Sequence, residues 1–138
     1  MIDWRFIPRP DLAAFARREL ELRLAQWPAA VDDGRMTARE AEDDILAWRA
    51  LAELLEHGAT AVDREWTEII AAIDLACARR RAALDEAVAT GSAKQGAFSE
   101  RLFLLRALAA LARDQRTRSH VPRIDHVAGA GKAIPLAA

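Results

Sequence analysis

A helix stop followed almost at once by a helix start, within residues 32–40, most constrains the fold of this chain. Gly34 suits the left-handed conformation that commonly follows the last helical residue. Thr37 and Glu40 have the spacing of a capping box, which starts a helix. Because only two residues separate Gly34 from Thr37, the two helices must turn back on each other. The sequence therefore predicts an antiparallel αα-hairpin.

Apolar residues at helical spacing predict both helices of this hairpin, over residues 11–57. The first helix begins near Asp11 and runs toward Gly34, and the second runs from the capping box to the residue before Gly58. The first stripe consists of Leu12, Ala16, Leu20, Leu24, Trp27 and Val31, and the second of Ala41, Ile45, Trp48, Ala52 and Leu55. Since Pro28 removes a backbone donor, we expect a kink or short break just before it.

A second hairpin is predicted over residues 60–116. Its first helix starts near Thr60 and ends near Ala89, a loop covers residues 90–96, and its second helix occupies residues 97–116. The inward residues are Val62, Trp66, Ile69, Ile73, Cys77, Leu84 and Val88 in the first helix, and Phe98, Leu102, Leu105, Leu108 and Ala112 in the second. Tryptophans on three successive stripes, Trp27, Trp48 and Trp66, are predicted core residues.

The fold class follows from these patterns: all-α, with two antiparallel αα-hairpins packed as a four-helix bundle. We expect one domain over residues 1–118 and a flexible, irregular tail over residues 119–138, where prolines and glycines interrupt any helical period. The first ten residues are predicted to be extended, with Trp4, Phe6 and Ile7 lying against the body of the protein.

Charge and composition exclude several classes of protein. The net charge of −1 gives no global basic field for nucleic acid or anionic membranes. The single cysteine, Cys77, excludes an intramolecular disulfide, and its place on an inner stripe predicts a core residue. The N-terminus does not resemble a signal peptide, and no apolar run reaches the roughly 20 residues of a membrane span. We therefore expect a cytoplasmic protein that does not contact a membrane.

The histidines and acidic residues of this sequence do not have the spacing of a catalytic or metal-binding motif. The three histidines do not have the sequence spacing of metal ligands; they are His57, His120 and His126. Four acidic residues near the start of the second helix favour the helix dipole and are expected on a solvated face: Glu40, Glu42, Asp43 and Asp44. We predict no cofactor, no metal site and no catalytic residue, and hence no enzyme.

Arginines supply the candidate contacts for a macromolecular partner. They are Arg79, Arg80, Arg81, Arg113, Arg116, Arg118 and Arg123. Guanidinium groups of this kind bind phosphates, so nucleic acid is an alternative partner. Three consecutive helical residues fan over about 200°, however, so residues 79–81 do not form one stripe.

A resemblance to known sequences covers residues 12–57. The residues that carry it are Glu19-Leu20-Glu21-Leu22-Arg23, Trp27-Pro28, Val31, Gly34-Arg35-Met36-Thr37 and Glu40-Ala41. This pattern resembles small helical hypothetical proteins of phage and prophage genomes, in which an aromatic-Pro pair and a Gly-x-Met-Thr-x-x-Glu-Ala turn join two helices. Trp27 stands where that group has Tyr, and the second hairpin has no counterpart in the pattern. The resemblance implies a mobile-element origin and a role through binding.

The sequence thus predicts a non-enzymatic phage or prophage accessory protein that acts by protein–protein binding, with inhibition of a host defence or nucleic-acid-processing complex as its expected mode. The expected partner is a host or phage protein, and homo-oligomerisation is left open. The alternative is a nucleic-acid-binding accessory factor that uses the basic residues of the third helix and of the C-terminal region.

Overall fold

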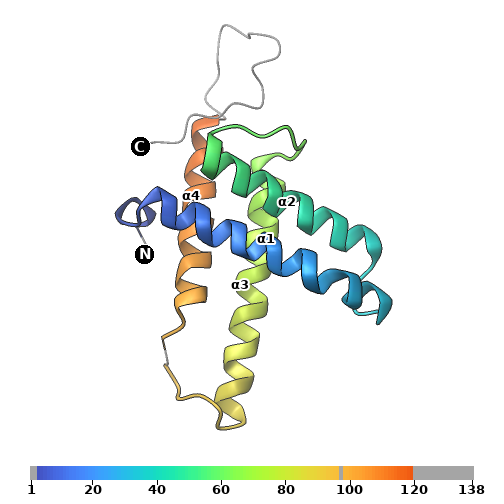
Figure 1. Cartoon of the computed structure of the whole chain (residues 1–138). Helices are drawn as coiled ribbons and strands as arrows, with labels where there is room; N and C mark the ends of the chain where they lie inside the picture. Colours follow the sequence, from blue (N-terminus) through green and yellow to red (C-terminus); the bar gives the residue numbers. More distant parts are fainter. Residues whose placement is uncertain (1–2, 97, 120–138) are drawn as a thin grey trace, which may run out of the picture.

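The computed structural model describes residues 3–96 and 98–119, and the regular structure of this part of the chain is entirely helical (Figure 1). A 3-10 turn precedes four helices, which are η1 (Trp4–Phe6), α1 (Arg9–Asp32), α2 (Ala38–His57), α3 (Trp66–Ala89) and α4 (Glu100–Ser119). Helix α1 packs against α2, α3 packs against α4, and the two hairpins form a bundle. The predicted fold class is confirmed, while the expected tail beyond Ser119 lies outside the described residues.

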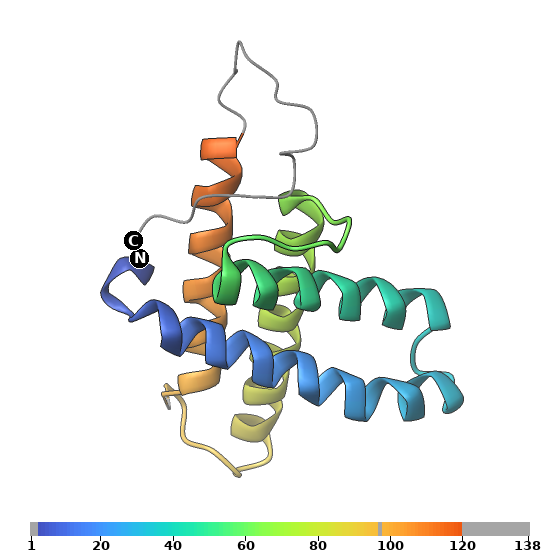
Figure 2. The same ribbon diagram turned by 45° about the horizontal axis from the view of Figure 1, so that its top comes forward.

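The two hairpins cross as two layers (Figures 1 and 2). The pair α1–α2 lies across the pair α3–α4, so each hairpin is covered by the other over only part of its length. The connected ends of both hairpins project past the crossing, one where α1 turns into α2 and one where α3 turns into α4. The fold therefore has a shared core at the crossing and two hairpin ends with fewer neighbours.

The core at the crossing is built from leucine, isoleucine, alanine and tryptophan side chains of all four helices. Trp48 and Trp66 are only 1% and 5% exposed, which confirms both as core residues. Trp4 of η1 also packs into this core, as predicted. Trp27 is half-buried rather than buried, because it lies where α1 leaves the crossing. Removal of this apolar surface from water is the main force that holds the two layers together.

The turn between α1 and α2 has the predicted conformation. Gly34 adopts a φ of 75°, and the N–H of Arg35 donates to the carbonyl of Ala30 at 2.9 Å, as in a Schellman motif. The Thr37 hydroxyl accepts from the Glu40 N–H at 3.0 Å, and the Glu40 carboxylate accepts from the Thr37 N–H at 2.8 Å. The capping box is therefore confirmed.

Helix α3 begins at Trp66, six residues later than predicted. Gly58 ends α2 with a φ of 78°, and Thr60 then forms its own local turn. The Thr60 hydroxyl donates to the Glu53 carboxylate at 2.5 Å and accepts from the Val62 N–H at 3.0 Å. These local hydrogen bonds of the Thr60 side chain compete with the backbone hydrogen bonds of a helix, so the connection between α2 and α3 extends to residue 65.

Helix α4 covers residues 100–119 rather than the predicted 97–116. The Ser99 hydroxyl accepts a hydrogen bond from the Leu102 N–H at 3.2 Å, which makes Ser99 the N-cap. Phe98 therefore precedes the helix and is 76% exposed, so the prediction that it faces inward is wrong.

Pro28 does not interrupt α1, which continues to Asp32. The carbonyl that loses its hydrogen-bond donor belongs to Leu24, a residue that is 46% exposed. The expected break is absent, and Leu24 is not the core residue that the apolar stripe predicted.

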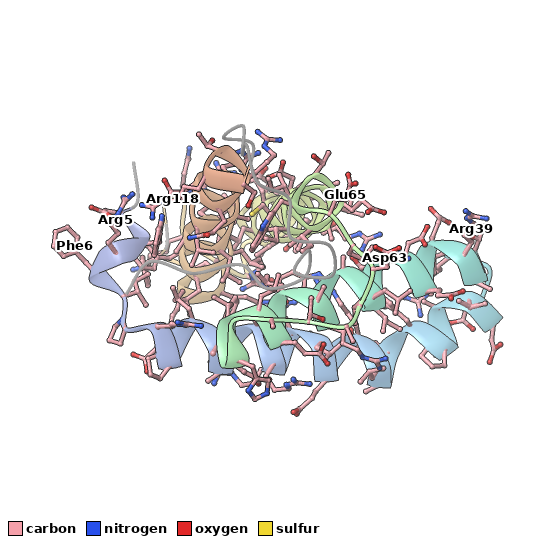
Figure 3. All side chains as sticks on the ribbon, turned by 90° about the horizontal axis from the view of Figure 1, so that it is seen from above. Arg5, Phe6, Arg39, Asp63, Glu65 and Arg118 are labelled. Atoms are coloured by element: carbon pink, nitrogen blue, oxygen red, sulfur yellow. The ribbon has the colours of Figure 1, made fainter. Side chains whose placement is uncertain are left out.

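Phe6 also departs from the prediction that it lies against the body. Its side chain is 87% exposed and points away from the helices, as Figure 3 shows. Neighbouring Trp4 is buried and Ile7 is half-buried, because the 3-10 turn directs successive side chains to different sides.

Candidate protein-interaction surface

The projecting end of the α3–α4 hairpin is the least covered helical part of the described chain. We call residues 77–96 and 98–106 the α3–α4 tip. Helix α3 has buried side chains up to Ala76, and no residue from Cys77 to Ala89 is buried. This half of the helix is about 20 Å long at 1.5 Å per residue. The α1–α2 layer crosses the other half of α3, and α1 contacts the tip at Trp27, beside Arg79, and at Glu19, beside Arg101.

Two phenylalanines give the α3–α4 tip an exposed aromatic pair. Phe98 is 76% exposed and Phe103 is 38% exposed, and their ring centroids lie 5.9 Å apart. Ser99 holds Phe98 outside the helix, while Phe103 occupies the first turn of α4. Aromatic side chains that remain accessible together are typical anchors of protein–protein interfaces.

Aliphatic and sulfur-containing side chains in the tip half of α3 are only partly buried. Leu84 and Val88 are half-buried although they keep the helical spacing of the core stripe. Cys77 is half-buried against the core, and burial raises the pKa of its thiol, with a further contribution from the carboxylate of Asp74. A thiol with a raised pKa is protonated at neutral pH and is a poor nucleophile, which agrees with the prediction of a packing cysteine.

A buried ionic cluster joins α1 to α2 next to the crossing. The guanidinium of Arg23 donates to Asp44 Oδ2 at 2.8 Å and to Glu19 Oε1 at 2.9 Å. All three side chains are less than 10% exposed. The prediction that Asp44 belongs to a solvated acidic face is therefore wrong. Burial of this carboxylate is tolerated because it accepts charge-assisted hydrogen bonds from Arg23 and from the Trp27 indole, the latter at 2.8 Å.

The α3–α4 tip is fastened to this cluster by Arg101. Its guanidinium donates two hydrogen bonds of 3.0 Å to the carboxylate of Glu19. Paired bonds of this kind fix orientation as well as distance. The start of α4 is thus held against α1, while the aromatic pair on either side of Arg101 stays exposed.

Guanidinium groups and indole rings stack alternately where α1 approaches α3. The guanidinium of Arg23 lies 4.3 Å from the ring centroid of Trp48 and 5.8 Å from that of Trp27. Arg79 of α3 lies 5.5 Å from the Trp27 ring. Arg79 is therefore turned toward the α1–α2 layer, where cation–π attraction holds it.

Most of the predicted arginine contacts already have partners within the chain. Arg80 bonds to the Ser99 hydroxyl at 3.4 Å. Three others lie within salt-bridge distance of aspartates: Arg81 with Asp85, Arg113 with Asp74, and Arg118 with Asp114. Arg116 is half-buried on α4, and Arg123 lies outside the described residues. The arginines are not gathered into one patch, because the first three lie at the α3–α4 tip and those of α4 lie about 10–18 Å beyond the tip along that helix.

Sequence reasoning missed the residues that define this surface. Phe98 was expected inside α4, although Ser99 carries the signal of an N-cap that excludes it. The ionic cluster also went unpredicted, although Glu19 and Arg23 have the i, i+4 spacing of a helical ion pair. Nothing in the sequence pairs Arg101 with Glu19, because that contact depends on how the hairpins cross.

Within residues 3–96 and 98–119, no three His, Cys, Asp or Glu side chains gather as metal ligands would. None of the described helices has the length and apolarity needed to cross a membrane. No family model, curated protein or solved structure matches this chain.

Proposed function

We propose that this chain is a non-enzymatic accessory protein of phage or prophage origin that acts by binding another protein through the α3–α4 tip. A host or phage protein is the partner, and inhibition of a host defence or nucleic-acid-processing complex is the mode of action. The origin rests on the resemblance of residues 12–57, and the surface rests on the structure.

The observation that carries this proposal is the exposed pair Phe98 and Phe103. Burying two aromatic rings on a partner removes a large apolar area from water. The rings sit on a fixed support, since Ser99 caps α4 and Arg101 ties the same turn to Glu19. An anchor that is already rigid loses little conformational entropy on binding.

Nucleic-acid binding is the weaker candidate for this geometry. Phosphate contact needs cations that are free to reach a backbone, and Arg81, Arg113 and Arg118 each face an aspartate. Binding of DNA or RNA by the remaining basic residues stays a prediction. Its signature would be an affinity that falls steeply between low and moderate salt.

The test is affinity purification of the full chain from host lysate, followed by mass spectrometry. The Phe98→Ser/Phe103→Ser double variant is compared with wild type and with Phe6→Ser, whose ring is 87% exposed at the opposite end of α1 from the hairpin turn. We expect a host or phage protein that wild type and Phe6→Ser both retain and that the double variant loses. The same set of retained proteins from all three chains would contradict the proposal.

A further inference from the structure

We draw no further inference here: the strongest candidate, the exposed aromatic pair Phe98 and Phe103 at the α3–α4 tip, belongs to the surface already described, and nothing in the structure shows what covers it.

Discussion

The guanidinium of Arg101 on α4 forms two hydrogen bonds, each 3.0 Å long, with the carboxylate of Glu19 on α1. The two residues are 82 positions apart in the chain and belong to different hairpins. Glu19 also accepts from Arg23, so one buried carboxylate bridges two guanidinium groups, and Asp44 supplies the second negative charge of the cluster. The relative position of the two layers is therefore fixed by a specific polar contact as well as by the apolar core.

Arg101→Ala tests how much this contact stabilises the crossing. The substitution removes two charge-assisted hydrogen bonds to Glu19, whose carboxylate still accepts a hydrogen bond from Arg23. We therefore expect the free energy of unfolding to fall by about 1–3 kcal/mol. Urea denaturation followed by circular dichroism measures the change. Arg106→Ala is the control, because Arg106 is exposed on the same helix, and it should change stability by less than about 0.5 kcal/mol. Equal effects of the two substitutions would show that the Arg101 contact does not hold the layers.

Arg23→Met tests the buried ionic cluster. The substitution leaves Asp44 buried with only the Trp27 indole as a donor, and we expect it to lower the free energy of unfolding by about 3–5 kcal/mol. The matched control is Arg17→Met on the same helix. Arg17 bonds to Glu56 at the surface, where ion pairs contribute about 0–1 kcal/mol. A loss for Arg23→Met as small as that of the control would mean that Asp44 is not buried.

Thr37→Ala tests the start of α2. The hydroxyl that caps the Glu40 N–H is removed, so we expect a loss of about 0.5–2 kcal/mol in unfolding free energy. Thr67 is exposed in the first turn of α3, and Thr67→Ala should have little effect. An unchanged urea midpoint for Thr37→Ala would show that the cap does not determine where α2 begins.

The same capping box predicts a pH dependence through Glu40. The Thr37 backbone N–H, and then its hydroxyl, hold the pKa of the Glu40 carboxyl below its ordinary value. A folded-state pKa below the unfolded value stabilises the fold above the unfolded pKa of about 4.3, and this contribution is lost as the pH falls through the lower folded value. We therefore expect wild type to be more stable than Glu40→Gln at pH 7, with a difference that closes under acid conditions. Urea midpoints of both chains between neutral and acid pH measure it, and a difference independent of pH would contradict the assignment.

Pro28→Ala should stabilise the protein. Proline in a helix interior costs about 3 kcal/mol, and part of that is offset because proline also restricts the unfolded chain. Restoring a donor for the Leu24 carbonyl should therefore raise the free energy of unfolding by about 2 kcal/mol. Pro10 lies in the first turn of α1, where no donor is needed, so Pro10→Ala serves as the control and should not stabilise. A destabilising Pro28→Ala would show that the ring itself packs at the hairpin end.

The parts of the fold that depend on local chemistry could be predicted from the sequence. The turn from Gly34 to Thr37 and the end of α2 at Gly58 follow from backbone geometry and capping, which act between residues a few positions apart. The starts of α3 and α4 were misplaced because Thr60 and Ser99 both satisfy nearby backbone groups. Each of these residues sets a local boundary that an apolar period does not reveal.

The candidate surface could not be predicted, because it depends on where the two hairpins cross. The periodicity of Leu84 and Val88 is the same as that of Ile69 and Ile73, yet only the latter pair is buried. Asp44 and Asp43 are adjacent in an acidic run, but Asp44 alone faces the guanidinium of Arg23. Burial of a particular residue is a property of the packed layers, and a single sequence records only which face of a helix is apolar.

The crossed arrangement of the hairpins bears on the order in which the chain folds. Within each hairpin, contacts join residues near one turn, so both hairpins can form quickly and independently. Contacts between the layers, such as that of Arg101 with Glu19, close a far longer loop and should form late. Loss of this contact should therefore accelerate unfolding while leaving the refolding rate nearly unchanged. The ion pair of Arg101 and Glu19 would then act mainly by slowing the separation of the two layers during unfolding.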